Sequence, residues 1–405
     1  MNKLITPQIL KGFRDFLPED AQKRQYVIDV IRRTFELYGF VPIETPAIEY
    51  LETFTGNIGE DEHLFYKFKD QGGRDVALRY DQTVPTCRVI AQYPSKITLP
   101  FKRYQIQTVW RAEKPQKGRY REFLQCDADI FGVEDASADG ETIALSIDIY
   151  KNLRFKKPIA IINDRELYKD IPYKAITAID KLEKVGASGV LQELNQKGFS
   201  NKDAKTLLDT IKNNKPNDRL KKIFDYLDGY GLTENYQYKP TLARSFSYST
   251  GPIWEIVVGD FPTGSLLGGE RFDSLVSRFS NMKVPGTGFA IGFDRTILAM
   301  EELGLFPPIS TKTKVLVTIF DETTLRYSQK IAQLLRSHAI PTDLFPDPNQ
   351  KLEKQLKYAL KKGVPLVLIA GPDELRKQSV TVKNLATRTQ KTVQLKELPH
   401  ALNLT

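Results

Sequence analysis

The sequence is poor in the residues on which thiol, imidazole and membrane-spanning structures depend. Its 405 residues include two cysteines and three histidines (His63, His338 and His400). Two cysteines exclude a disulfide framework and a cysteine-rich zinc site, and three histidines leave little room for chemistry that needs several imidazoles. No apolar run approaches the ~20 residues of a membrane span, and the first residues lack the apolar core of a signal peptide. We therefore expect a cytoplasmic protein with no membrane contact and no metal held by its own side chains.

Charge is distributed unevenly along a composition that is otherwise typical of a folded protein, with 41% hydrophobic and 27% charged residues. The net charge is +9, and residues 311–405 alone hold 16 lysines and arginines against eight acidic residues. A basic module on a nearly neutral body indicates that a polyanion docks on the module. A merely lysine-rich, well-solvated domain accounts for the charge equally well at this point.

Hydrophobic periodicity divides the chain into two parts. Residues 19–38 have the spacing of an amphipathic helix, 75–80, 104–110 and 122–131 are β-like, and about 165–240 is polar and helical in pattern, which suggests an inserted helical subdomain. Strand-like and helical segments then alternate after a Gly/Pro-containing linker at 304–310, which predicts a small α/β domain. We expect one domain over 1–310, with the helical insertion, and a second over 311–405.

The most informative segment is 103–131, where two β-like runs flank a turn between Pro115 and Gly118. Arginines at alternating strand positions, such as Arg119 and Arg121, project from one face of a strand. Guanidinium groups match phosphate oxygens with paired hydrogen bonds, so this hairpin could hold a triphosphate without a glycine-rich loop. A surface ladder of alternating charges remains the alternative.

Two further clusters suggest binding of a small charged ligand. In LRYDQTVPTCR (78–88), Asp81 and Thr83 would share one face if the segment is extended and would suit an ammonium group, although an Asp-initiated turn before Pro85 explains them as well. In TLARSFSYSTGPIWE (241–255), Arg244 stands in an aromatic run and is costly to bury unless an anion meets it. The alternative for Arg244 is a structural ion pair.

Other candidate motifs favour structural roles. GTGFAIGFDR (286–295) departs from the dinucleotide-binding fingerprint in its glycine spacing and lacks the preceding apolar strand and the later acid, so tight packing of a strand against a following helix explains it better. GSLLGGERFD (264–273) allows close approach of the backbone to a ligand. Cys87 and Cys126 have no histidine beside them in sequence and are expected to be buried, inert thiols. His63 is expected to be a loop histidine.

Taken together, these motifs resemble those of class II aminoacyl-tRNA synthetases and, within that class, the histidyl-tRNA synthetase family. Motif 1, the dimer-forming element, is matched by the early helix at 19–38 together with GFVPIETPAIE (39–49), and motif 2 by VWRAEKPQKGRYREFLQCDADIFG (109–132). Motif 3 is matched by GTGFAIGFDRTIL (286–298). LRYDQTVP and the Arg244 segment resemble the two histidine-binding motifs, and the basic tail resembles the anticodon-binding domain of this family.

The resemblance implies a fold and an activity. The fold would be a mixed α/β chain: an α+β catalytic domain on an antiparallel sheet, with a helical insertion, and a small C-terminal α/β anticodon-binding domain. The activity would be that of an aminoacyl-tRNA ligase, which uses ATP with Mg²⁺ to form histidyl-adenylate and passes the histidyl group to the 3′ end of tRNA(His). The partners would be L-histidine, tRNA(His) and a second copy of the chain in a homodimer.

The same resemblance implies roles for residues in the nucleotide site. Arg111 would hold the α-phosphate and the amino-acid carboxylate, and Glu113 would hydrogen-bond adenine. Arg119 would bind the γ-phosphate, while Phe123 and Arg295 would sandwich the adenine ring. The bound carboxylate is already ionised, so attack on the α-phosphorus needs no protein base and depends on positioning and on placed cations.

Further roles follow for the amino-acid and tRNA sites. The histidine ammonium group would be bound by Asp81, Thr83 and Gln125, and the imidazole would face Asp129. Arg244 would contact the α-phosphate and the substrate histidine. Lys114 and Gln116 would meet the acceptor end of the tRNA.

The sequence departs from the family at three positions. The second histidine motif usually ends in two tyrosines; here Tyr248 fills the first position and Ser249 stands at the second, which normally touches the imidazole. Asp129 and Asp294 stand where glutamate is common. An alternative reading is a non-aminoacylating relative, such as the synthetase-like regulatory subunit of ATP phosphoribosyltransferase. Such proteins usually lack the anticodon domain and the catalytic arginines, whereas this chain has the tail and Arg111, Arg119 and Arg295.

Overall fold

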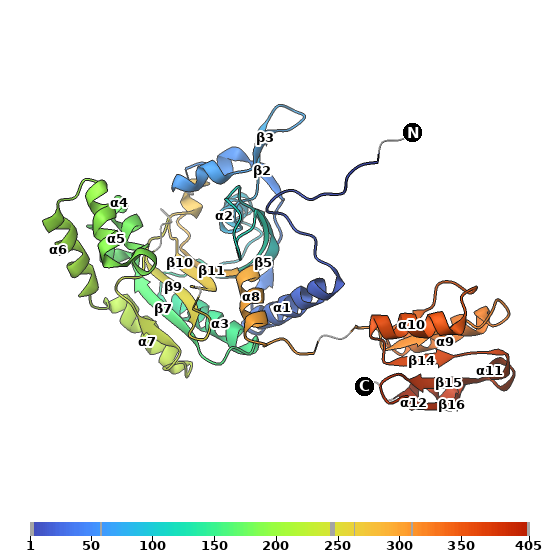
Figure 1. Ribbon diagram of the computed structural model, residues 1–405. Helices are drawn as coiled ribbons and strands as arrows, with labels where there is room; N and C mark the ends of the chain where they lie inside the picture. Colours follow the sequence, from blue (N-terminus) through green and yellow to red (C-terminus); the bar gives the residue numbers. More distant parts are fainter. Residues whose placement is uncertain (1–3, 57–58, 244–247, 263, 309–310, 403–405) are drawn as a thin grey trace. The chain divides into compact units, whose positions relative to one another are not determined.

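The computed structural model describes residues 4–56, 59–243, 248–262, 264–308 and 311–402. The chain forms two units, Met1–Phe306 and Pro307–Thr405, and each is described by itself. The first unit is built on an eight-stranded sheet in the order β1-β5-β6-β11-β10-β9-β7-β8 (Figure 1). Among its described strands, the pairs β1–β5 and β7–β8 are parallel and the others are antiparallel. The predicted antiparallel-sheet catalytic fold is therefore confirmed.

The strands of the large sheet are short at its edges and long at its centre. Their bounds are β1 (Val41–Pro42), β5 (Phe101–Trp110), β6 (Glu122–Phe131), β7 (Pro158–Asp164), β8 (Tyr236–Tyr238), β9 (Pro252–Val258), β10 (Leu267–Arg271) and β11 (Gly286–Gly292). The predicted hairpin is the β5–β6 pair, the longest in the sheet.

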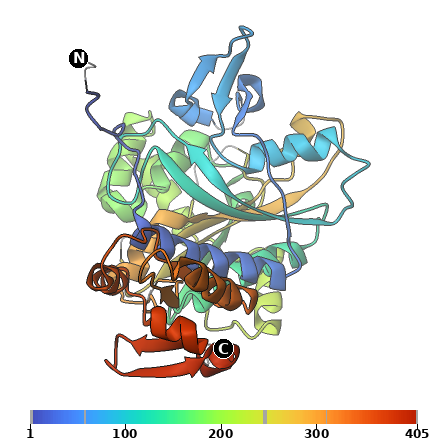
Figure 2. The same ribbon diagram turned by 90° about the vertical axis from the view of Figure 1, so that its right-hand side faces the viewer.

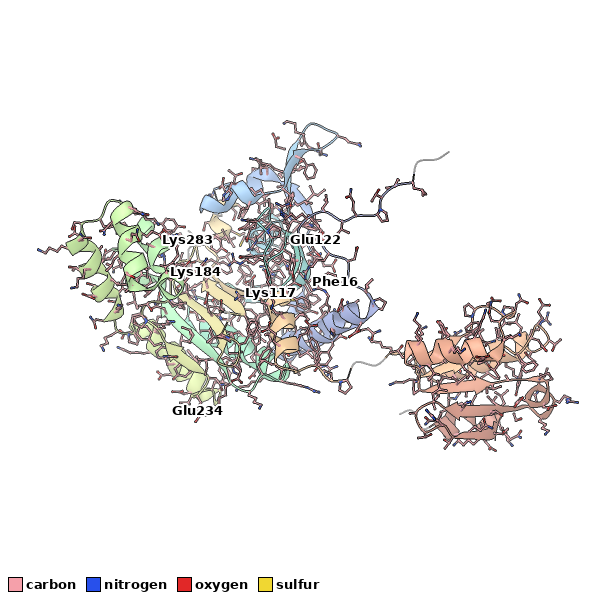
Figure 3. The ribbon with its side chains drawn as sticks, in the orientation of Figure 1. Phe16, Lys117, Glu122, Lys184, Glu234 and Lys283 are labelled. Atoms are coloured by element: carbon pink, nitrogen blue, oxygen red, sulfur yellow. The ribbon has the colours of Figure 1, made fainter. Side chains whose placement is uncertain are left out.

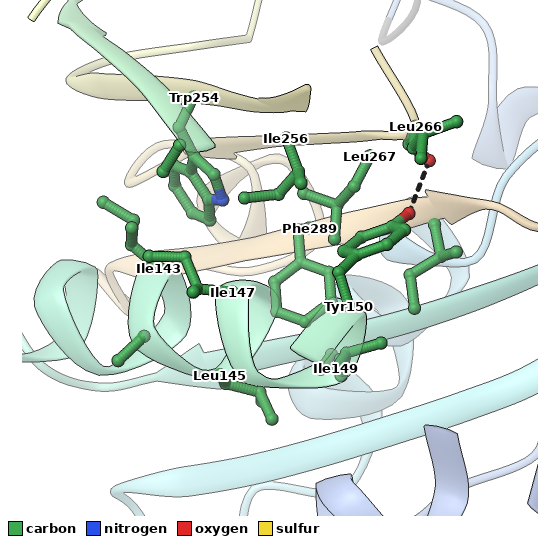
Figure 4. Packing of buried hydrophobic residues seen from close by; sticks show 14 of the residues in the cluster. Ile143, Leu145, Ile147, Ile149, Tyr150, Trp254, Ile256, Leu266, Leu267 and Phe289 are labelled. Atoms are coloured by element: carbon green, nitrogen blue, oxygen red, sulfur yellow. Dashed lines mark hydrogen bonds between the residues drawn. The ribbon is translucent and has the colours of Figure 1, made fainter. Parts of the chain in front are cut away.

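Helices cover one face of this sheet because alternate strand residues are apolar. On β6, Cys126, Ala128 and Ile130 belong to the main hydrophobic core, whereas the residues between them are polar. The covering helices are α1 (Pro18–Leu37), α3 (Ala136–Asn152) and α8 (Phe293–Glu302). Figure 4 shows α3 against the sheet, with the hydroxyl of buried Tyr150 donating to the carbonyl oxygen of Leu266 at 2.9 Å.

The predicted first helix illustrates how local sequence sets an element's limits. Proline at its first position has the backbone angle a helix needs, and Glu19 and Asp20 in the first turn favour the positive end of the helix dipole. Gly39, at φ +76°, follows its end. Between these limits Val27, Ile31 and Phe35 are fully buried.

A smaller three-stranded sheet, in the order β2-β4-β3, stands at the far end of the unit from α3 (Figures 1 and 2). With α2 it encloses a separate core around Tyr80, Phe131 and Phe272. The elements of this region are β2 (Ile48–Tyr50), η1 (Leu51–Thr53), η2 (Gly59–Leu64), β3 (Lys67–Lys69), β4 (Asp75–Leu78), α2 (Thr83–Gln92) and η4 (Val276–Arg278). His63, expected in a loop, lies in the last turn of η2.

The stretch between β7 and β8 is helical and consists of two differently anchored parts. Its elements are η3 (Arg165–Tyr168), α4 (Tyr173–Ile179), α5 (Leu182–Gln196), α6 (Asn201–Lys212) and α7 (Asp218–Gly229). Helices α4, α5 and α6 share a small core of their own, which includes Ile176, Leu194 and Ile211. Helix α7 instead buries Leu220 and Ile223 in the main core, against α3.

The second unit is a five-stranded sheet in the order β13-β12-β14-β15-β16. Its elements are β12 (Val315–Val317), α9 (Leu325–Ser337), β13 (Thr342–Leu344), α10 (Leu352–Lys362), β14 (Leu366–Ile369), α11 (Pro372–Lys377), β15 (Ser379–Asn384), β16 (Gln390–Gln394), η5 (Leu395–Glu397) and α12 (Leu398–Leu402). The predicted alternation of strands and helices is confirmed, with α11 and α12 as additional short helices. Within the described residues of the chain, no helix has the length and apolar character needed to cross a bilayer.

A buried ion pair joins α3 to β10. Asp139 and Arg271 are 0% and 1% exposed, and the guanidinium Nη1 lies 3.2 Å from the carboxylate. Arg271 also contacts Asp273 and donates to the carbonyl oxygen of Val133. Arg219, on α7, reaches Asp139 at 3.0 Å from a partly exposed position.

We expect Asp139→Ala to lower the free energy of unfolding by about 3–5 kcal/mol, because it leaves a guanidinium buried without its carboxylate. Arg219→Ala is the control and should cost about 1 kcal/mol or less, since its side chain is 31% exposed. Urea unfolding followed by tryptophan fluorescence reports on the first unit, because Trp110 and Trp254 both lie there. Equal costs for the two variants would contradict this ranking.

Candidate active site

The face of the large sheet opposite α3 is polar, and strand β11 contributes only glycine and alanine to it near the site. The register aligns Arg103 on β5 with Asp129 on β6, Gly288 on β11 and Glu270 on β10. The next residues of β11 on this face are Ala290 and Gly292. A Cβ on Gly288 would lie 1.8 Å from Oδ1 of Asp129, so the carboxylate occupies the space that a side chain there would fill. Farther along β11, the small residues Ala290 and Gly292 leave room for a ligand.

A cavity of about 210 Å³ lies in this space. It brings together predicted site residues from four separate sequence segments: Asp81, Thr83, Arg111, Phe123, Gln125, Asp129, Tyr248 and Arg295. Glu270 and the backbone of β10 and β11 complete the lining. Ser249 is buried next to it, and its hydroxyl donates to Oε2 of Glu270.

A larger cavity of about 830 Å³ shares Arg111, Phe123, Gly292 and Arg295 with the smaller one. The predicted residues Glu113, Lys114, Gln116 and Arg119 also line it, as does His63. Lys114 and Gln116 are exposed on the turn of the hairpin. The two cavities are thus continuous along one arginine-rich boundary.

At the boundary between the two cavities, arginine side chains lie beside aromatic rings. The guanidinium carbon of Arg111 lies 4.4 Å from the ring centre of Tyr80 and 5.3 Å from that of Phe123, and Nε donates to the carbonyl oxygen of Tyr80 at 3.3 Å. Burial lowers the pKa of Arg295, and the positive charge of Arg119 acts in the same sense. An anion at this boundary would relieve the repulsion between these cations.

Carboxylates dominate the floor of the smaller cavity. Burial raises the pKa of Asp81 to about 6 and that of Asp129 to about 6. Burial also raises the pKa of Asp127, which lies two residues before Asp129 on β6, well above its usual range. The buried guanidinium of Arg103 opposes this shift at Asp127 and Asp129, and it forms an ion pair with Asp129. Such a floor is suited to a ligand that carries positive charge.

The segment that contains Asp81 forms the Asp-initiated turn, and its two polar residues also line the smaller cavity. Thr83 begins helix α2, so the segment is not extended as the shared-face argument assumed. Asp81 accepts a hydrogen bond from the backbone N–H of Val84 at 3.1 Å, which is an Asp-initiated turn. Asp81 and Thr83 nevertheless both line the smaller cavity.

The expectation that Arg119 and Arg121 project together is wrong, because residues 111–121 form a loop and not a continued strand. Arg119 is exposed, lines the larger cavity and lies 3.6 Å from Glu113. Arg121 donates to the carbonyl oxygens of Glu113 and Lys11 at 3.0 and 3.3 Å, and its own N–H donates to Gly12. Arg121 therefore ties the hairpin loop to the N-terminal segment.

Asp294 is bound by two arginines from the N-terminal segment. Arg14 and Arg24 reach its two carboxylate oxygens at 2.8 and 2.7 Å. The guanidinium of Arg14 also stacks on the ring of Tyr120, 3.2 Å from its centre. These groups line a third cavity of about 280 Å³, together with Phe16 and Lys117, which Figure 3 labels. The shorter acid at this position is thus part of an ion-pair cluster beside Arg295.

Sequence reasoning missed Arg103, Asp127 and Glu270. Asp127 lies inside the recognised run 122–131, between two apolar neighbours, and that isolated charge was the available signal. Arg103 lies just before the recognised run 104–110. Glu270 follows two glycines in a segment that was assigned to backbone contact alone. Arg244 lies outside the described residues. Cys87 and Cys126 are 0% exposed, as expected, and burial raises both thiol pKa values. Within the described ranges, no group of three or more His, Cys, Asp or Glu residues is arranged to hold a metal ion.

In comparison with known proteins, a family model matches each of the two units. The family model described as "Histidyl-tRNA synthetase" matches residues 12–296, and that described as "Anticodon binding domain" matches 309–403. The histidine–tRNA ligase of Cytophaga hutchinsonii is 37% identical, with 98% of this chain and 99% of that protein covered. The histidine–tRNA ligase of Wolinella succinogenes is 36% identical, with 96% of each covered.

Solved structures with a similar fold give a further comparison. Histidyl-tRNA synthetase from Nostoc sp. PCC 7120 has a TM-score of 0.83 at 27% identity, with 98% of this chain and 99% of that chain covered. A protein from Bacillus halodurans C, described as an ATP phosphoribosyltransferase regulatory subunit/histidyl-tRNA synthetase, has a TM-score of 0.73 at 22% identity, with 91% and 99% covered, and shows the fold alone. On these matches, which run nearly the full length of the chain, the protein belongs to the histidyl-tRNA synthetase family.

Proposed function

We propose that the protein activates L-histidine with ATP to form histidyl-adenylate and transfers the histidyl group to the 3′ end of tRNA(His). The observation that carries the proposal is the junction of the two cavities at Arg111, Phe123 and Arg295. A carboxylate-lined cavity suits a cationic amino acid, and an arginine-lined cavity suits a nucleoside triphosphate. Their common boundary is where the two substrates must react.

In the first step, a carboxylate oxygen of histidine attacks the α-phosphorus of ATP and pyrophosphate leaves. The nucleophile is already ionised, so the protein contributes positioning and positive charge. Arg111 is assigned to bridge the amino-acid carboxylate and the α-phosphate, and its position in the lining of both cavities supports this role. Arg119, in the larger cavity, is assigned to the γ-phosphate. Arg244 is assigned to the α-phosphate on its motif alone.

The adenine base is assigned to the space between Phe123 and Arg295, with Glu113 as its hydrogen-bond partner; all three line the larger cavity. In the smaller cavity, Asp81, Thr83 and Gln125 are assigned to the ammonium group of histidine. Asp129 and Tyr248 are assigned to the imidazole end. Mg²⁺ is proposed to arrive with ATP and to neutralise its outer phosphates.

For the second step, the exposed positions of Lys114 and Gln116 on the hairpin loop support contact with the acceptor end of the tRNA. The basic 311–405 segment is assigned to the anticodon stem-loop, whose unpaired bases can be read by side chains. The reaction is proposed to take place in the cytoplasm.

A homodimer is proposed on the motif 1 segment. Leu37, Val41, Ile48 and Tyr50 are apolar and between 47% and 75% exposed there. A cluster of exposed apolar side chains on one short stretch is typical of a protein–protein contact.

We expect pyrophosphate exchange into ATP to depend on histidine among the twenty amino acids. Arg111→Ala should lower its rate by about 10²–10³-fold, because a cation placed on the transferring group is lost. Lys117→Ala, on the same loop but with a side chain 74% exposed, is the control and should retain the rate. Exchange supported by another amino acid would contradict the specificity, and equal loss in both variants would contradict the role of Arg111.

Asp81→Asn should weaken histidine binding at least tenfold and yet raise thermal stability at pH 7.5. The carboxylate has a folded-state pKa of about 6, so burying it ionised is unfavourable, whereas an amide oxygen can still accept from Val84. As pH falls through 6 toward 4, the native state takes up a proton before the unfolded state does. The stability advantage of the variant should therefore shrink over that range. Thermal melts at several pH values, beside the KM for histidine, measure both effects; a variant less stable at pH 7.5 would refute the argument.

Removing residues 311–405 should weaken tRNA binding and leave histidine-dependent pyrophosphate exchange largely intact, because both cavities lie in the first unit. Filter binding of tRNA(His) at two salt concentrations measures the first effect, and the salt dependence should become shallower. Loss of exchange together with tRNA binding would argue against a separate RNA-reading unit.

A further inference from the structure

Glu270 is a buried carboxylate that no sequence motif assigned to the site. It lies on β10, is 6% exposed and lines the smaller cavity. The hydroxyl of Ser249 donates to its Oε2. Ser249 itself is 8% exposed and follows Tyr248, which lines the same cavity. The residue that replaces the family's imidazole-contacting tyrosine is therefore bonded to a second acid of the pocket.

The strand register sets Glu270 opposite Asp129. Gly288 pairs with Asp129 on one side and with Glu270 on the other, so the two acids stand on one face with a glycine between them. Strands are ~4.8 Å apart, which separates the two backbones by about 10 Å. The Asp129 carboxylate reaches over Gly288 toward Glu270, and both acids line the smaller cavity, so a five-membered ring bound there can donate one hydrogen bond to each of them.

We propose that Glu270, oriented by Ser249, is a specificity-determining residue that accepts a hydrogen bond from one imidazole nitrogen while Asp129 accepts one from the other. The inference rests on the proposed function and deepens it. A carboxylate accepts but does not donate, so two carboxylates require both ring nitrogens to carry hydrogen. The histidine side chain is therefore bound as the imidazolium cation.

The electrostatics of the pocket support a cationic ring. The negative charge of Glu270 raises the pKa of Asp129, so a cationic ring bound between the two acids would relieve their repulsion. Arg103 approaches Asp129 from β5, on the side away from Glu270. Ser249 acts through Glu270 and is a positioning residue, because its hydroxyl donates to that carboxylate.

Steady-state exchange kinetics of Glu270→Gln test the proposal. We expect its KM for histidine to rise at least tenfold, with the KM for ATP and kcat nearly unchanged. Ser249→Ala should raise the KM for histidine about three- to tenfold, and Ser249→Thr, which keeps the hydroxyl, should restore it. Glu141→Gln, on α3 and paired with Lys102, removes a comparable glutamate on the other face of the sheet and is the control.

A ring analogue gives a second readout that misfolding would not produce. A triazole analogue of histidine has the same size but stays neutral near pH 7, so the native protein should discriminate strongly against it. In Glu270→Gln the new amide can donate to an unprotonated ring nitrogen, and the ratio of kcat/KM for histidine over the analogue should fall at least tenfold. An unchanged ratio together with an unchanged KM for histidine would overturn the proposal. Absence of histidine-dependent exchange in the native protein would instead overturn the proposed function.

Discussion

The ion pair between Arg103 and Asp129, beneath the smaller cavity, is the contact on which the site depends. Both groups are almost completely buried, and buried ions destabilise a protein unless each finds a partner. The pair allows charge to be placed on the polar face of a sheet whose other face is the main hydrophobic core. Asp129 in turn lies over Gly288, so the absence of a side chain at that position lets the charged carboxylate sit at the floor of the cavity.

Local sequence was sufficient to predict the elements that have a strong period and clear ends. Helix α1 has a proline start and a glycine stop, and the β5–β6 hairpin has a turn between two β-like runs. Helix α2 was missed because its first residues, Thr83 and Val84, are β-branched and precede a proline. The two short helices α11 and α12 have too few residues to show a period.

The candidate site was predictable where residues belong to a motif and unpredictable where distant segments meet. Arg111, Phe123 and Gln125 were recognisable from one stretch of sequence. The arginines that bind Asp294 come from more than 260 residues earlier in the chain, and no local pattern connects them. The role proposed for Glu270 depends on the register of β10 with β11 and on the contact with Ser249. Strand register is not visible in a single sequence. Departures from a family motif, such as Ser249, were visible, but their partners were not.

The division of the helical stretch between two cores has a consequence for protein engineering. Helices α4 to α6 could be exchanged for those of a relative with little disturbance to the sheet, because their apolar faces pack in a small core that is separate from the main one. Helix α7 could not be part of that graft, because its apolar residues belong to the main core and pack against α3. The natural cut points of a chimera therefore lie before Tyr173 and between Lys212 and Asp218, well inside the stretch that sequence composition alone would mark as one module.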